Sequence, residues 1–170
     1  MTINGAPINR PDHDLLLEIK PAKPEDAAAL TTIAFAAKRH WGYPERWMEH
    51  WRSVLTISPG FIGSHETYIA VINDQIVGFY ALGRPETALD LLHLWVSPDW
   101  MGQGAGRFLF LHALERTEIL CFSELKIESD PNAEAFYLRL GARRVSVNFY
   151  EIDQYRRELP VLICEINRAV

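Results

Sequence analysis

The chain has few cysteines and no excess of basic residues. Cys121 and Cys164 are the two cysteines among its 170 residues; both lie in apolar surroundings and neither belongs to a C-x-x-C pair. This usage predicts buried, reduced thiols rather than a disulfide framework. The formal net charge of -5 gives no general attraction to nucleic acid or to an anionic membrane, so we expect neither as a partner.

Long hydrophobic runs and metal-ligand spacings are also missing. No apolar run approaches the roughly 20 residues of a membrane span, and the N-terminal segment lacks the basic and apolar regions of a signal peptide. The six histidines show no ligand spacing with acids or thiols, so no metal site is predicted. We therefore expect a soluble, cytoplasmic protein, and 48% hydrophobic residues over this length fit one globular domain.

Hydrophobic periodicity divides the chain into a flexible tail, residues 1–14, and a single domain, residues 15–170. The pattern predicts strands over residues 15–22, 67–74, 75–85, 87–98, 124–130, 142–153 and 158–167, and helices over residues 24–41, 44–57, 104–119 and 132–141. The turn at Asn73-Asp74 favours antiparallel pairing, whereas the crossover helix 104–119 favours a parallel pair. The predicted fold class is α/β (α+β), with a mixed central sheet of six to seven strands flanked by about four helices.

The helix predicted over residues 44–57 carries an aromatic stripe. Trp47, Trp51, Val54 and Leu55 are spaced i, i+4, i+7 and i+8, which places them on one helical face. Such a stripe is more typical of packing against a sheet than of a binding surface.

A nearly uninterrupted apolar strand runs into a helix through a turn that contains Gly102, Gly104 and Gly106. Without Cβ atoms, this turn can bend tightly and expose peptide N–H groups at the positive end of a helix, an arrangement suited to a diphosphate. A Walker loop would need lysine and then serine or threonine where Arg107 and Phe108 stand, which argues against NTP hydrolysis.

Two other interpretations of the turn stay open. Its G-x-G-x-G spacing departs from the G-x-G-x-x-G of dinucleotide folds, but Glu128 or Asp130 could serve as the ribose-binding acid of a nucleotide-dependent oxidoreductase. The turn could also open the helix without holding any ligand.

Two segments around the turn narrow the choice. Val96-Ser97-Pro98 precedes GQGAGR, residues 102–107, and the stretch from Asp130 to Arg144 reads DPNAEAFYLRLGARR. With the order of elements, these segments resemble the GNAT superfamily of acyl-CoA-dependent N-acetyltransferases, and the resemblance covers residues 15–165. The chain departs from the family's pattern at Met101, where glutamine or arginine is usual, so we expect weaker rather than absent cofactor binding.

The resemblance implies acetyl-CoA as co-substrate. Peptide N–H groups of the turn would bind its diphosphate, and the backbone near the end of strand 87–98 would pair with the amides of its pantetheine arm. The implied cofactor-binding residues are Leu94, Trp95, Val96, Met101, Gly102, Gln103, Gly104, Ala105, Gly106, Arg107, Asn132, Phe136 and Tyr137. Core packing also explains the side chains of residues 94–96, and helix capping alone would explain Asn132.

Three residues are candidates for catalysis. By resemblance, the Tyr137 hydroxyl would protonate or hydrogen-bond the departing thiolate. Asp90 interrupts an apolar strand, six residues before Val96, and His93 is the second candidate for a base that deprotonates the acceptor amine. Strand alternation puts Asp90 on the face of Leu92, Leu94 and Val96, with His93 on the other face, unless a bulge reverses the order. Turn capping or a buried polar contact explains Asp90 and His93 about as well.

The predicted reaction is transfer of an acetyl group from acetyl-CoA to a primary amine by direct attack, since no cysteine lies in a nucleophile motif. By resemblance, Trp41, Tyr43, Trp47 and His50 could frame the amine acceptor, a small molecule or a peptide, although packing explains them equally well. Arg157 could reach an anion on the substrate or order the last strands. The alternative is a non-catalytic acyl-CoA-binding or partner-interaction module on the same scaffold. Exposed strand edges also fit a homodimer.

Overall fold

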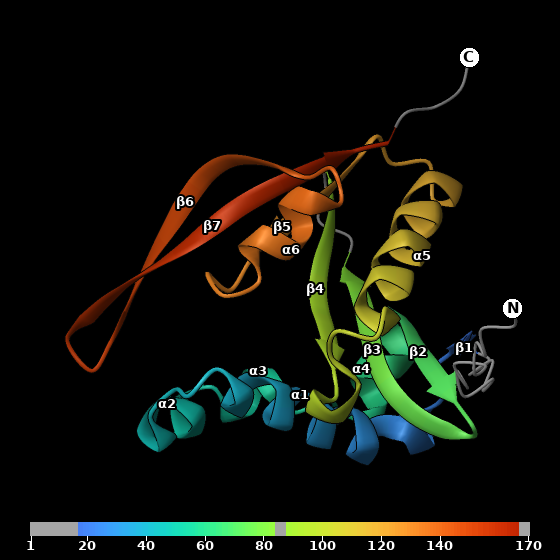
Figure 1. Cartoon of the computed structure of the whole chain (residues 1–170), viewed down its shortest axis with the longest axis horizontal. Helices are drawn as coiled ribbons and strands as arrows, with labels where there is room; N and C mark the ends of the chain where they lie inside the picture. The colour runs from blue at the N-terminus through green and yellow to red at the C-terminus, as the bar shows by residue number, and fades with distance from the viewer. Residues whose placement is uncertain (1–16, 84–87, 167–170) are drawn as a thin grey trace, which may run out of the picture.

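The computed structural model describes residues 17–83 and 88–166, so the predicted tail lies outside the described residues. Seven strands form one sheet in the order β1-β2-β3-β4-β5-β7-β6 (Figure 1). Their bounds are Leu17–Pro21 (β1), Glu66–Ile72 (β2), Gln75–Gly83 (β3), Leu89–Val96 (β4), Glu124–Glu128 (β5), Arg143–Ile152 (β6) and Tyr155–Glu165 (β7).

The sheet is mixed, as predicted. β1 to β4 form an antiparallel meander, with a turn at Asn73 and Asp74 in which both residues have positive φ. β5 runs parallel to β4 after a crossover, and β7 pairs antiparallel with both β5 and β6. Because β4 with β5 is the single parallel pair within residues 17–83 and 88–166, this is not the parallel sheet on which dinucleotide-binding oxidoreductases are built.

Six α-helices occur in the described part of the chain, rather than about four. They are Ala27–His40 (α1), Glu45–His50 (α2), Arg52–Leu55 (α3), Pro59–Ser64 (α4), Ala105–Ile119 (α5) and Glu134–Arg139 (α6), and the short 3-10 helices Pro24–Asp26 (η1) and Pro98–Trp100 (η2) precede α1 and α5. The single helix predicted over residues 44–57 is wrong, since it is divided into α2 and α3, and α4 follows where no helix was predicted. The chain leaves helical geometry at Trp51, becomes extended at Thr56, and restarts at Pro59 with the Ser58 hydroxyl capping the Phe61 N–H.

The helices cover the two faces of the sheet with separate cores. On one face, α5 and α6 pack over the central strands through Leu109, Phe110 and Tyr137. On the other face, α1 to α4 bury Leu30, Met48 and their neighbours against β2 and β3. A residue of β4 or β5 therefore faces either the α5 side or the α1 side of the molecule, and this decides which half of a site between those strands it can serve.

A β-bulge in β4 reverses the alternation that simple parity predicts. Leu94 pairs with Tyr80 and His93 with Ala81, but the next pair joins Leu91 to Leu82, so Leu92 has no partner. Asp90, opposite Gly83, therefore lies on the same face as His93. The prediction that Asp90 shares a face with Leu94 and Val96 is wrong, and this bulge is the reason.

β6 and β7 form a long hairpin that extends away from the rest of the sheet (Figure 1). Its turn at Asp153 and Gln154 has positive φ at both residues, as in the primed turns that suit twisted hairpins. Arg46 pairs with Asp153, and the ring of Trp47 contacts that of Tyr155, so α2 touches the tip of the hairpin. The Trp stripe thus packs partly on β7, although Val54 is exposed.

The two cysteines occupy different environments. Cys164 is buried in β7, as predicted, whereas Cys121 is exposed in the turn between α5 and β5, where its φ is positive. The prediction of a buried Cys121 is wrong because this tight turn lies at the surface.

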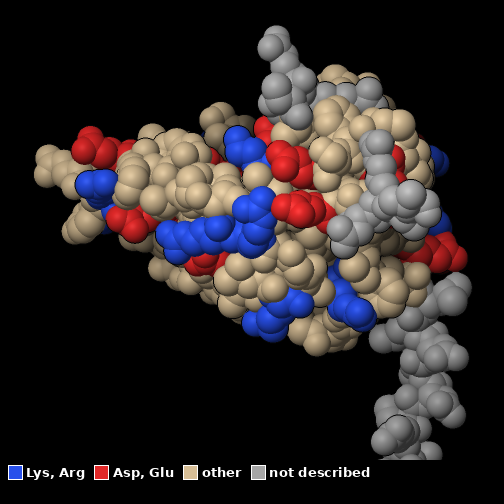
Figure 2. Space-filling model, turned by 90° about the horizontal axis from the view of Figure 1, so that it is seen from above, with Lys and Arg blue, Asp and Glu red and all other residues tan. Residues whose placement is uncertain are grey.

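Charges of both signs lie side by side on the face seen from above (Figure 2). None of the described helices has the length and apolar character needed to cross a bilayer. Among the same residues, no cluster of three or more His, Cys, Asp or Glu side chains could hold a metal ion.

Candidate functional site

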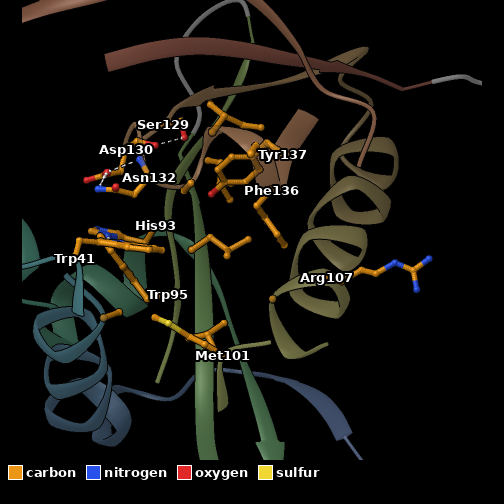
Figure 3. A pocket seen from close by; sticks show the side chains of 18 of the residues that line it. Trp41, His93, Trp95, Met101, Arg107, Ser129, Asp130, Asn132, Phe136 and Tyr137 are labelled. Atoms are coloured by element: carbon orange, nitrogen blue, oxygen red, sulfur yellow. Dashed lines mark hydrogen bonds between the residues drawn. The ribbon is translucent and has the colours of Figure 1, made fainter. Parts of the chain in front are cut away.

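A cavity of about 540 Å³ opens where β4 and β5 separate. The two strands pair from Leu89 to Leu91, and β4 then continues to Val96 without β5 beside it. The residues lining the cavity come from the turn before α5, the ends of β4 and β5, the start of α6 and the last turn of α1 (Figure 3). One end of the cavity therefore lies on the α5 side of the sheet and the other end on the α1 side.

The glycine turn forms the α5 end. Gly102 and Gly104 have φ of 75° and 94°, a conformation that L side chains rarely adopt, and with Gly106 they line the cavity. In the described part of the chain, the peptide N–H groups of residues 102–107 have no hydrogen-bond acceptor. Unpaired N–H groups at the start of a 15-residue helix form an anion-binding surface.

Not every predicted residue of the turn faces the cavity. Met101 and Arg107 line it, although the Arg107 side chain points outward in Figure 3. Gln103 does not line the cavity; its side-chain amide instead donates to the Asp99 carbonyl oxygen at 2.8 Å. Ala105 is buried in the core instead.

Leu94, Trp95 and Val96, which were predicted to bind the cofactor, form the β4 wall of the cavity. Gly78 of β3 lies opposite Val96 and lets the two strands approach closely. A Cβ built on Gly78 would lie 2.7 Å from the Trp95 carbonyl oxygen and 3.3 Å from the Val96 Cα.

Tyr137 and Phe136 of α6 form the facing wall, and their rings pack on Phe110. Tyr137 is 6% exposed, and no described residue hydrogen-bonds its hydroxyl, which points into the cavity in Figure 3. Burial and then the Asp130 charge raise the pKa of Tyr137, so its hydroxyl keeps its proton at neutral pH.

Asn132 also lines the cavity, but capping does not explain it. The N-cap residue of α6 is Ala133. The Asn132 amide instead donates to the Tyr43 hydroxyl and to Asp130 Oδ1, each at 3.0 Å.

A buried network around Asp130 supports the cavity from behind, and the sequence interpretation missed it. Asp130 Oδ2 accepts from Lys38 Nζ at 2.5 Å, and Arg157 Nη2 lies 3.5 Å away. The Tyr43 hydroxyl donates to both Asp130 oxygens at 2.9 and 3.0 Å. The ammonium of Lys38 and the guanidinium of Arg157 also lie over the Trp51 ring.

Burial and mutual charge shift the pKa values in this network. Burial lowers the pKa of Lys38 despite the attraction of Asp130. Burial alone would raise the pKa of Asp130, but Lys38 and the other donors outweigh it and hold that pKa below its usual range. Burial and Asp130 raise the pKa of Tyr43 to about 12. Asp130 is therefore an ionised carboxylate whose oxygens are already occupied, which makes it a poor proton acceptor.

The two predicted bases differ in position. Asp90 does not line the cavity, and burial, opposed by Lys126, raises its pKa. His93 does line the cavity, on the α1 side. Burial lowers the pKa of His93 to about 4, so the imidazole is neutral at physiological pH.

The residues predicted to frame an acceptor separate into two groups. Trp41 lines the cavity, and Ala37 of α1 lies beside it. Tyr43 and Trp47 do not line it; they pack on Arg157, and the Trp47 indole nitrogen is buried without a partner in the described residues. His50 is exposed on α2. Glu128 and Ser129 at the end of β5 line the cavity and were not predicted as acceptor residues, although both directly precede the quoted motif that starts at Asp130.

Solved structures share this fold. A GCN5-related N-acetyltransferase from Rhodopseudomonas palustris superposes with a TM-score of 0.73 at 23% identity, over 87% of this chain and 94% of that chain. The PaiA N-acetyltransferase from Thermoplasma acidophilum, in complex with coenzyme A, gives 0.73 at 17% identity, over 88% and 99%. The ribosomal-protein-S18-alanine N-acetyltransferase from Escherichia coli gives 0.68 at 20%, over 91% and 97%. The TM-scores establish a shared fold.

The sequence comparisons address the family directly. No curated protein sequence matches this chain. The family model described as an acetyltransferase (GNAT) domain matches residues 49–152, more than half of the chain. That span includes the glycine turn, the β4 wall and the α6 wall of the cavity, so this chain belongs to the GNAT family of acetyltransferases.

Proposed function

We propose that this protein transfers an acetyl group from acetyl-CoA to a primary amine, which attacks the thioester directly. The observation that carries the proposal is one continuous cavity. It runs from the glycine turn, where residues with free peptide N–H groups line it, to the Tyr137 hydroxyl; those residues are Gly102, Gly104, Gly106 and Arg107. Neither cysteine lines the cavity, which supports direct attack without an acyl-enzyme.

The residues of the cavity fit coenzyme A. Gly102 and Gly104 adopt backbone conformations that would be strained in any residue with a side chain. The peptide N–H groups from Gly102 to Arg107 would bind the diphosphate. The edge of β4 from Leu92 to Val96 has no β5 partner, so its backbone can pair with the amides of the pantetheine arm. Bound there, acetyl-CoA would supply the activated thioester.

Tyr137 would act at the leaving group. Its hydroxyl keeps its proton and has no partner among the described residues, so it is free to donate to the departing sulfur. Core packing on Phe110 and Phe136 holds the ring in place.

Glu128 is the carboxylate that we propose as the proton acceptor for the amine. Two carboxylates line the cavity, and Asp130 is saturated by Lys38, Tyr43 and Asn132. Glu128 is exposed; the Tyr150 hydroxyl donates to its two oxygens at 3.0 and 2.9 Å, and the Asn148 amide donates to Oε2. Neither donor is charged, and Oε1 keeps a lone pair free for an ammonium group.

The test measures binding and turnover separately. Calorimetry of the wild type should detect coenzyme A binding, and thiol release with a panel of amines should detect turnover. Tyr137→Phe should lower kcat about 100-fold and leave coenzyme A affinity unchanged, as expected for loss of a general acid. Tyr155→Phe, at the exposed hairpin tip, is the matched control.

Two results would contradict the proposal. Coenzyme A binding without turnover of any amine would favour the non-catalytic acyl-CoA-binding module. An unchanged kcat in Tyr137→Phe would remove this tyrosine from the mechanism.

A further inference from the structure

His93 is held in one orientation by its neighbours on the α1 side of the cavity. It is 8% exposed and lines the cavity. Its Nδ1 atom accepts a hydrogen bond from the Trp95 indole N–H at 3.1 Å. The ring of Phe61 meets the imidazole edge-on, with centroids 5.4 Å apart. The His93 and Trp95 side chains lie side by side in Figure 3.

This contact decides which nitrogen carries the proton. Because the Nδ1 lone pair accepts from Trp95, the proton of the neutral imidazole resides on Nε2. No described residue accepts from Nε2. A nitrogen that already carries a proton cannot take one from an amine, so in this state His93 is a donor rather than a base.

The charges around His93 restrict what its N–H can meet. Among the residues that line the cavity from α1, β4 and the end of β5, Glu128 and Asp130 carry charge and His93 is neutral. The two cavity-lining arginines, Arg107 and Arg139, belong to α5 and α6 on the other face of the sheet, and Lys38 and Arg157 are paired with Asp130. A carboxylate would find no free cation on this wall and would face Glu128, whereas an uncharged oxygen needs only the donor.

We infer that His93 is a neutral hydrogen-bond donor to the acyl acceptor, and that the acceptor is a primary amine bearing an uncharged oxygen, an amide carbonyl or a hydroxyl, close to the reacting nitrogen. The inference rests on the proposed function. Glu128 would face the amine, Nε2–H of His93 would bind the oxygen, and Trp41 would cover the body of the molecule. Trp95 is the positioning residue that fixes the tautomer of His93.

The first test reads the tautomer without an acceptor. In ¹⁵N NMR of the labelled protein saturated with coenzyme A, His93 should show a protonated Nε2 and an unprotonated Nδ1 from pH 8 to pH 5. In Trp95→Phe the two tautomers should mix. A proton on Nδ1 in the wild type, or titration of His93 near its ordinary pKa of 6.5, would overturn the inference.

The second test uses four amines with one body: 2-phenylethylamine, phenylalaninol, phenylalaninamide and phenylalanine. Thiol release from acetyl-CoA gives kcat/KM for the wild type, His93→Leu and the exposed control His50→Ala. The wild type should favour the amide or the alcohol, and His93→Leu should reduce that preference over 2-phenylethylamine about fivefold to tenfold, the worth of one hydrogen bond. The KM for acetyl-CoA should not change.

The outcomes are distinguishable. The same relative preference in His93→Leu and wild type, or a best substrate that is phenylalanine, would each overturn the inference. Turnover of none of the four while coenzyme A binds would overturn the inference if other amines of the panel are acetylated, and the proposed function if none is. Failure of the wild type to bind coenzyme A would contradict the proposed function instead.

Discussion

The two ends of the cavity are built from different parts of the chain. At the α5 end, the cavity offers unpaired peptide N–H groups of the turn, residues 102–107, and the free backbone edge of β4. At the α1 end, the surface consists of side chains, and the network behind it joins Lys38, Tyr43, Asp130 and Arg157 through hydrogen bonds between residues up to 114 positions apart. The backbone end suits a ligand common to a whole family, whereas the side-chain end can differ from one family member to another.

The network should be the more fragile end when one partner is removed. Asp130→Ala leaves Lys38 and Arg157 buried without a counter-charge, which costs about 3–5 kcal/mol of unfolding free energy. Urea unfolding, monitored by tryptophan fluorescence, measures this loss of unfolding free energy. The double variant Lys38→Met/Asp130→Leu should recover part of the loss, because Arg157 is then the one charge of the network left without its partner. A loss below about 1 kcal/mol for Asp130→Ala would mean that the network does not stabilise this end.

Acid should weaken the same end through His93. The imidazole of His93 has a pKa near 6.5 in the unfolded state and about 4 in the folded state. Between these two pH values the unfolded state binds a proton that the folded state does not bind. Unfolding free energy therefore falls as the pH falls from 6.5 to 4, by about 3 kcal/mol in all. His93→Leu should lose less stability over this range than the wild type. Equal pH slopes in urea unfolding would contradict a buried, neutral His93, and His50→Ala is the control.

The backbone end should respond to strain at one glycine. Gly104→Ala places a side chain at φ 94°, which costs about 1–2 kcal/mol and displaces the N–H groups beside it. Calorimetry should show coenzyme A affinity about tenfold weaker. Gly63→Ala is the matched control and should bind coenzyme A normally. Gly63 has no positive φ, and no atom lies within 4 Å of the new Cβ. Unchanged affinity in Gly104→Ala would show that the turn does not hold the diphosphate.

The smallest effect is expected where α2 meets the hairpin tip. The ion pair between Arg46 and Asp153 is exposed, so Arg46→Ala should change stability by less than about 1 kcal/mol. It should raise the KM of an amine acceptor no more than about threefold and leave that of acetyl-CoA unchanged. Arg52→Ala, whose pair with Glu49 stays within the α2–α3 segment, controls for loss of charge. A larger change in the KM of acetyl-CoA would show that the two ends are coupled.

The contrast also explains what the sequence could predict. The succession of strands along the chain, the parallel β4–β5 pair and the glycine turn follow from local patterns, because glycines, turns and periodicity act over a few residues. The β-bulge at Leu92 and the break between α2 and α3 at Trp51 have no such local sequence signal. Lys38 was not singled out from the sequence, although it follows the buried Leu30 by eight residues and so lies on the inward face of α1. Its partner Asp130 is 92 residues away, so local patterns could not join them.

Gly78 has a consequence for where variants should be sought. It lies outside the cavity, yet any side chain there would press on the Trp95 carbonyl and shift the end of β4. The position of the strand edge that would receive the pantetheine arm is therefore set by a residue of the neighbouring strand. Libraries aimed at changing acyl-donor affinity should include this site, although it would never touch the donor.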